Sequence, residues 1–193
     1  LKGLGTNNLK GKAFVTSGLG GMSGAQAKAL IVTGATGIIA EVDHDAIRQR
    51  IADHYIREED VFTDLDSMLT QFVKSKNAEE ARCFVYQGNI VEVWEKLVFR
   101  HIHIELGSDQ TSCHNIDHLG YCPVECTFEE AKALMDDDKE GFDQAIKRSL
   151  RRHVDAINVM CSRGMYFWDY GNAFLFEAAR AGADIMDPHK PSG

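Results

Sequence analysis

Four glycines between residues 14 and 26 could hold a phosphate group. In the stretch FVTSGLGGMSGAQ, Gly18, Gly20, Gly21 and Gly24 follow an apolar run typical of a strand and precede a segment typical of a helix. Such a turn gathers backbone N–H groups at the positive end of a helix dipole, and glycines have no Cβ to block an anion. The spacing departs by one position from the regular G-x-G-x-x-G fingerprint. Taken alone, the stretch fits either a phosphate site or a tight strand-to-helix connection.

Glu41 ends the next apolar run, GIIAE, and adds weight to the phosphate interpretation. An acid at the end of the second strand of a dinucleotide-binding unit can accept hydrogen bonds from an adenosine ribose. The order of strand, glycine turn, helix, strand and acid therefore favours NAD over NADP. A second pair, Gly34 and Gly37, stands where the first helix should end, and we interpret it as a helix C-cap and turn.

The elements that would position these residues alternate between strands and helices. This alternation predicts an α/β fold that is Rossmann-like, a mostly parallel sheet with helices on both faces, in one domain over residues 1–193. The segment 139–163 repeats apolar residues every three or four positions and is the clearest helix. We expect strands at 12–16, 37–41, 83–87, 102–106 and 165–168, and helices at 22–33, 44–54, 64–76, 90–99, 127–136, 139–163 and 171–181.

The charge and residue composition limit the kinds of partner that the protein is expected to bind. A formal net charge of -8 argues against a general attraction to nucleic acid or to an anionic membrane. The sequence contains no apolar run of bilayer-spanning length and no signal peptide, and the 5 cysteines have no disulfide-dense spacing. These features predict a cytoplasmic protein without nucleic-acid or membrane partners. The chain begins at LKGLGTNN without an initiator Met, so we expect it to be a piece of a longer protein.

Five motifs in one order give the chain a family resemblance. TSGLGGMSGAQ, IAEVD, QTSCHN, GYCPV and YFWDYGNAFLFEAARAGAD together resemble urocanase, and the match is collinear across nearly the whole chain. The resemblance implies the family's central NAD-binding domain. It also implies a hydratase of histidine degradation that converts urocanate and water to 4-imidazolone-5-propanoate, with tightly bound NAD+ as an electrophile rather than a redox carrier. A homodimer is the family's usual assembly.

The resemblance also implies which residues contact NAD+. Backbone groups of Gly21, Met22 and Ser23 would contact the pyrophosphate, Glu41 would hold the ribose, and Tyr170 would lie near the nicotinamide and substrate. Further contacts would come from Asn89, Ile90, Gln110, Thr111, Ser112, Cys113, His114, Tyr121 and Cys122. The family's active-site cysteine matches none of the cysteines here, so we expect no catalytic residue in this chain and no hydratase activity from it in isolation.

Two positions depart from the family pattern. Many relatives carry Arg where this chain has Ala46, so an adenosine contact is either lost or supplied by Arg48. Ser23 replaces a common Gly, so the turn must accept a Cβ there. Neither change removes the anion site.

Other clusters invite different chemistry. Cys113, His114, His118, Cys122 and Cys126 could bind zinc, but C-x3-C is not the usual knuckle spacing, and we expect no metal.

His101 and His103 alternate on an expected strand, where we interpret them as satisfied histidines. The basic run 147–153 is interpreted as a solvated or salt-bridged helix face. At the level of function, an NAD-dependent dehydrogenase and an NAD-binding module without chemistry remain the alternatives.

Overall fold

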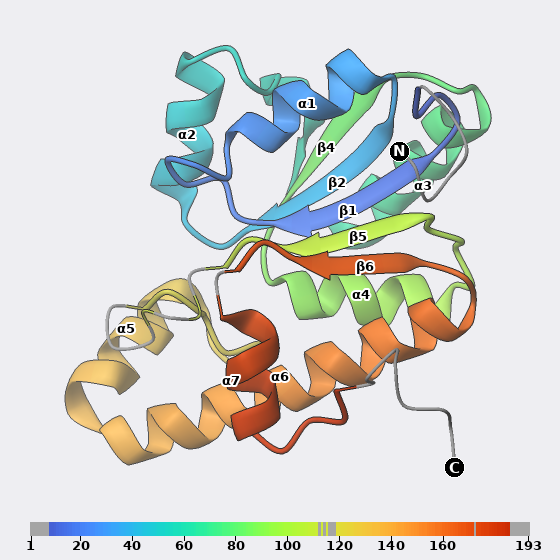
Figure 1. Cartoon of the computed structure of the whole chain (residues 1–193). Coiled ribbons are helices and arrows are strands. Elements are labelled where there is room, and N and C mark those ends of the chain that lie inside the picture. The colour runs from blue at the N-terminus through green and yellow to red at the C-terminus, as the bar shows by residue number, and fades with distance from the viewer. Residues whose placement is uncertain (1–7, 112, 114, 116–118, 172, 186–193) are drawn as a thin grey trace.

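A six-stranded parallel sheet forms the centre of the protein, and the predicted Rossmann-like α/β class is confirmed (Figure 1). The computed structural model describes residues 8–111, 113, 115, 119–171 and 173–185. The strand order is β3-β4-β2-β1-β5-β6, and every neighbouring pair is parallel. The strands are β1 (Ala13–Ser17), β2 (Thr36–Glu41), β3 (Val61–Phe62), β4 (Arg82–Gln87), β5 (Leu106–Asp109) and β6 (Tyr166–Asp169).

Helices cover both faces of this sheet, as predicted. Because successive side chains of a strand point to opposite faces, Ile38 of β2 packs on one side and Ile39 on the other. The Ile39 side is covered by α1 (Ala25–Thr33) and α2 (His44–Ala52). The Ile38 side is covered by α3 (Leu65–Asn77), α4 (Ile90–Phe99), α5 (Phe128–Asp137), α6 (Lys139–Ser162) and α7 (Phe174–Arg180).

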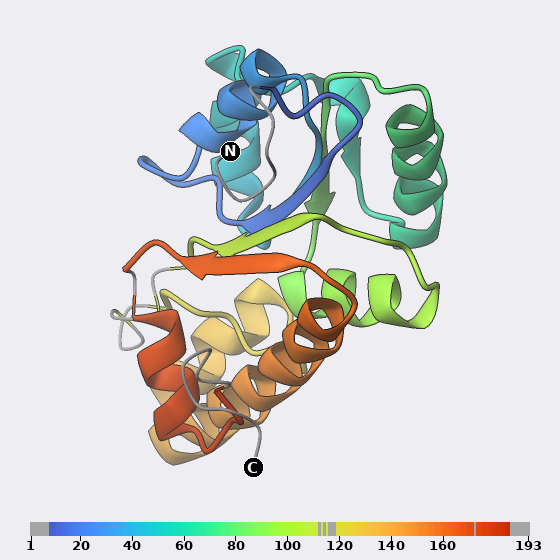
Figure 2. The same ribbon diagram turned by 45° about the vertical axis from the view of Figure 1, so that its right-hand side comes forward.

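The long helix α6 forms an outer layer on the Ile38 side. It packs against α4, α5 and α7, and Figures 1 and 2 show it running below β5 and β6. Its predicted apolar face is buried, including Phe142, Ile146, Leu150 and Val154. Within the ranges that the structure describes, no helix has both the length and the apolar character needed to cross a bilayer.

One strand lies elsewhere than the sequence predicted. We expected 102–106, but β5 is Leu106–Asp109, in register with Phe14 and Val15 of β1. Residues 102–104 belong to the connection after α4, where His101 has a positive φ of 53° and Ile104 is fully buried. The apolar alternation there comes from a buried connection, so His101 and His103 do not alternate on a strand.

Short elements and helix starts account for the other differences. The two-residue strand β3 and the 3-10 helix η2 (Glu58–Asp60) were not predicted, because neither is long enough to show a periodic pattern. Helix α1 begins at Ala25 rather than 22, because the preceding glycines form turns. Gly34 caps α1 in the left-handed conformation as expected, whereas Gly37 lies in β2, where a Cβ would come within 2.5 Å of Leu30 Cδ1.

The connections reverse direction beside β1. The chain passes from β1 through α1 to β2 on one side, and it later passes from β4 through α4 to β5 on the other side. In an open parallel sheet, such a reversal leaves a crevice at the carboxyl ends of the strands. The strands β1, β2, β4 and β5 end at this edge with Ser17, Glu41, Gln87 and Asp109.

Candidate functional site

A hollow of about 320 Å³ lies at the carboxyl edge of the sheet. Its walls come from the segments that follow β1, β2, β4 and β5, and from residues 119–122. Eight of the predicted contact residues line it, although they lie far apart in the sequence. They are Ser23, Glu41, Asn89, Ile90, Gln110, Thr111, Tyr121 and Cys122.

The glycine turn forms the first wall. Gly18 has a φ of +88°, and a Cβ there would lie 3.1 Å from the Gln110 carbonyl oxygen, so this position requires glycine. A Cβ on Gly24 would lie 2.7 Å from Arg50 Cδ. Ser23 is not among the residues with positive φ, so the turn accepts its Cβ without backbone strain.

Glu41 joins the second wall to the first. Its Oε2 accepts a hydrogen bond from the Leu19 N–H at 2.6 Å, and its Oε1 accepts one from the Asp43 N–H at 2.9 Å. Burial raises the pKa of Glu41, and the backbone N–H groups of Asp43 and Leu19 oppose that shift. A carboxylate has about four lone-pair sites, so it retains capacity for ligand hydroxyls beside these two bonds.

Ala46, at the variant position, lines the hollow beside this wall. Arg48, which could have compensated for it, instead pairs with Asp45 at 2.6 Å, and its side chain is 65% exposed. Another basic residue, Arg50, packs behind the glycine turn and pairs with Asp53 at 3.0 Å. None of the sequence motifs pointed to Arg50.

Asn89 fixes the third wall. It caps α4 by accepting from the Val91 N–H at 2.9 Å, and its Nδ2 donates to the Cys122 carbonyl oxygen at 2.8 Å. Glu92 completes a capping box at the same helix start. Since the side chain of Asn89 is already bonded at both ends, it secures the segment that contains Tyr121 and Cys122 as well as bordering the hollow.

A buried acid that sequence analysis missed lies beneath the fourth wall. Asp109 is fully buried, and its Oδ2 accepts from the Ser17 hydroxyl at 2.7 Å. Its Oδ1 accepts from the Thr111 N–H at 3.0 Å and from the Thr111 hydroxyl. The Gln110 N–H donates to the Ser17 oxygen at 3.3 Å. Burial, opposed by these donors, raises the pKa of Asp109 to about 6. A correctly placed β5 would have ended at this acid.

Several predicted contacts do not line the hollow. Met22 is 85% exposed, and a Cβ on Gly21 would meet nothing within 4 Å, so neither position is packed against the rest of the protein. Cys113 is buried in the main core, with its sulfur 3.3 Å from Thr111 Oγ1. Ser112 and His114 lie outside the described residues. The roles assigned to these five residues remain predictions.

Tyr170 also lies outside this hollow. It borders a separate small depression beside Phe14 and Leu30, and its ring packs edge-on against Trp168 at 5.9 Å. At 52% exposure it is open to solvent, and its predicted place near the nicotinamide remains a prediction.

The cysteine and histidine cluster and the basic run were the other candidates for a site. Burial raises the pKa of Cys113 and Cys122, which keeps both as thiols. Among the positions that are described, no three His, Cys, Asp or Glu residues form a group able to hold a metal, and His114 and His118 are not among them. In the basic run, Arg148 pairs with Glu125 and Arg152 pairs with Glu95, at 2.7 and 2.8 Å.

Comparisons with known proteins agree with the sequence motifs. The family model described as the urocanase Rossmann-like domain matches residues 2–190. The chain is 49% identical over 188 residues to the probable urocanate hydratase of Dictyostelium discoideum, a match covering 97% of this chain and 28% of that protein. It is 48% identical over 187 residues to the urocanate hydratase of Mus musculus, covering 94% of this chain and 27% of that protein.

The urocanate hydratase of Homo sapiens is 46% identical over 187 residues, with 94% of this chain and 27% of that protein covered. The chain thus spans little more than a quarter of the length of these relatives.

Proposed function

The chain belongs to the urocanase family, and on that premise we propose that it is the NAD+-binding part of a urocanate hydratase. The whole enzyme would add water to urocanate to give 4-imidazolone-5-propanoate. One observation carries the proposal for this chain. The Glu41 carboxylate lies at the end of β2 beside a glycine turn, on a hollow at the reversal point of a parallel sheet.

The residues present fit a dinucleotide. Gly18 and Gly20 line the hollow without side chains, which leaves backbone space for a pyrophosphate. The turn precedes α1, whose N-terminal dipole favours an anion. Gly21, Met22 and Ser23 would offer backbone contacts to the phosphates, and Glu41 would accept from the ribose hydroxyls.

The other walls would hold the dinucleotide from the opposite side. Gln110 and Thr111 follow β5, and Tyr121 and Cys122 form the wall secured by Asn89. When bound, NAD+ would supply an electrophilic centre for the substrate imidazole, without net hydride transfer. Tyr170 would contribute near the nicotinamide and substrate from the segment after β6.

The activity, assembly and location proposed next are those of the whole protein. The relatives extend well beyond this chain, and the family's active-site cysteine has no counterpart here, so the isolated chain would be inactive. We propose a homodimeric, cytoplasmic enzyme whose partner molecule is urocanate, and not nucleic acid or a membrane.

The test uses the full-length protein. Mass spectrometry after denaturation should detect released NAD+, and the ultraviolet absorbance of urocanate should fall without the appearance of reduced nicotinamide absorbance. A dehydrogenase would instead produce reduced nicotinamide during turnover. A protein that releases NAD+ but shows neither activity would be a binding module, which would contradict the hydratase proposal.

A further inference from the structure

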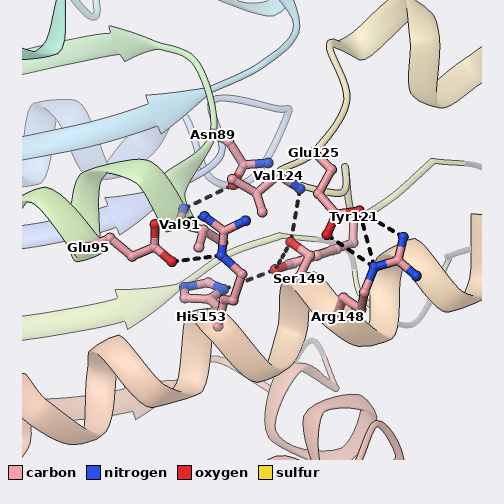
Figure 3. A network of polar contacts seen from close by, with 10 residues as sticks. Asn89, Val91, Glu95, Tyr121, Val124, Glu125, Arg148, Ser149 and His153 are labelled. Atoms are coloured by element: carbon pink, nitrogen blue, oxygen red, sulfur yellow. Dashed lines mark hydrogen bonds and ion pairs between the residues drawn. The ribbon is translucent and has the colours of Figure 1, made fainter.

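Two polar side chains of α6 are buried behind the wall formed by residues 119–124, of which 119–122 line the hollow. Ser149 and His153 are both 0% exposed, and they lie one helical turn apart on the otherwise apolar face of the helix. The Tyr121 hydroxyl lies 3.2 Å from Ser149 Oγ and 3.3 Å from His153 Nδ1. Figure 3 shows the three side chains meeting between α6 and the cleft wall.

Ser149 binds this wall at a second point. Its Oγ accepts from the Val124 N–H at 3.0 Å, so one hydroxyl contacts both Tyr121 and Val124. Donation can run from Val124 to Ser149, from Ser149 to Tyr121 and from Tyr121 to Nδ1 of His153. This order gives the Val124 N–H and both hydroxyls an acceptor, and it requires the neutral imidazole with its proton on Nε2. Burial lowers the pKa of His153 to about 3, which keeps the ring neutral.

The His153 ring also contacts the segment that follows β6. It stacks near Tyr121, with ring centres 6.2 Å apart, and it packs against Phe174 at 4.6 Å. Phe174 begins α7, shortly after Tyr170. Nε2 has no hydrogen-bond partner among the residues that the structure describes. One imidazole therefore supports both the wall with Tyr121 and the start of the helix next to Tyr170.

Weaker contacts surround these buried bonds. Arg148 pairs with Glu125 and Arg152 pairs with Glu95, both on the surface, where solvent screens the attraction. On the far side, Asn89 bonds the Cys122 carbonyl oxygen. The wall is thus held by α4 at Cys122 and by α6 at Tyr121 and Val124, and only the α6 contacts depend on Ser149 and His153.

We propose that Ser149 and His153 are positioning residues of the cofactor site, which hold the 119–124 wall and the start of α7 in place from behind. The inference rests on the proposed NAD+ site, because it assigns a purpose to the wall that these residues support. Their effect on NAD+ is transmitted through Tyr121, Val124 and Phe174, since neither residue lines the hollow.

The first experiment measures NAD+ affinity in full-length variants freed of cofactor. Tyr121→Phe removes only the hydroxyl, Ser149→Ala removes the hydroxyl that contacts both Val124 and Tyr121, and His153→Leu removes the ring nitrogen. Each should weaken NAD+ binding about tenfold, the effect of losing one well-placed buried hydrogen bond. His153→Asn should restore most of the affinity, because its amide can place a polar atom near the position of Nδ1.

A matched control separates positioning from general destabilisation. Ile157→Val alters the same face of α6 in the core, away from the wall, and should lower stability while leaving NAD+ affinity normal. If this control loses NAD+ as severely as Ser149→Ala, or if Ser149→Ala and Tyr121→Phe bind NAD+ normally, the positioning role is wrong.

A second readout does not depend on the cofactor. Hydrogen exchange at the Val124 amide should accelerate in cofactor-free Ser149→Ala and remain slow in Ile157→Val. If the wild-type protein shows this protection but binds no NAD+, the proposed function fails although the support of the wall is real. If the Val124 amide exchanges equally fast in wild type and Ser149→Ala, the support itself is refuted.

Discussion

The Leu19 backbone N–H donates to Glu41 Oε2 at 2.6 Å, so the acid at the end of β2 holds the turn that follows β1. This bond joins the two features from which a dinucleotide site was predicted. It also gives Glu41 a structural role in the protein without ligand, beside its proposed role toward a ribose.

Replacing Glu41 should therefore affect both the ligand and the turn. We expect Glu41→Ala to weaken NAD+ binding by at least about tenfold, because charge-assisted hydrogen bonds are roughly twice as strong as neutral ones. The Leu19 amide should also exchange faster in the absence of ligand. Asp45→Asn is the control, since its carboxylate is exposed and pairs with nearby Arg48. Titration calorimetry with NAD+ would measure the first effect, and normal affinity in Glu41→Ala would contradict the assignment.

Substitutions at two glycines of the same turn should separate an effect on ligand contact from an effect on folding. A side chain at Gly21 meets no atom within 4 Å, so Gly21→Val should fold normally but block close approach of a pyrophosphate. Gly18→Val should destabilise the fold itself, because Gly18 has a φ of +88°. Thermal unfolding and bound NAD+ should be measured for both variants. A stable Gly21→Val protein that retains NAD+ would remove Gly21 from the site.

The contribution of Asp109 to the free energy of unfolding should fall as the pH rises. Its pKa is raised from 3.8 to about 6 in the folded chain. Between these values the folded state holds a proton that the unfolded state has released, so stability is lost as the pH rises through this window. At about 1.4 kcal/mol for each unit, the loss approaches about 3 kcal/mol. In urea unfolding across this range, the stability of Asp109→Asn relative to wild type should increase with pH by up to this amount, and an unchanged slope would contradict the prediction.

His153 should have the opposite dependence. Its pKa is lowered from 6.5 to about 3, so below the upper value the unfolded chain binds a proton that the folded chain does not. Stability should therefore fall as the pH falls through this range. Where the two pH ranges overlap, the effects of Asp109 and His153 on stability have opposite signs and largely cancel. His153→Asn should reveal the slope of Asp109, and Asp109→Asn should reveal that of His153. Parallel stability curves for the two variants would disprove this pairing.

The parts predicted from sequence are those with a strong local pattern. β1, β2 and β4 are continuous buried apolar runs, and each was placed to within one residue. The apolar repeat of α6 correctly predicted its buried face. At the hollow, family motifs identified residues on all four strand ends, although their contacts with NAD+ stay predictions.

The parts that were missed depend on tertiary contacts. Ile104 fills the core from a connection, so its apolar character resembled a strand and hid Asp109 at the true end of β5. Ser149 and His153 are polar positions on an apolar helix face, which was a visible signal. Their partner Tyr121 could be recognised only once α6 was placed behind the wall.

The cross-links between the walls have a kinetic consequence. Leu19 is bonded to Glu41, Ser17 to Asp109, and Asn89 to Cys122, each without any ligand. The cost of ordering these segments is therefore met during folding rather than on binding, and the affinity gained by such preorganisation is expressed mainly as slow dissociation. The residence time of the dinucleotide should accordingly be long, so that bound nucleotide exchanges with radiolabelled NAD+ over hours and survives purification.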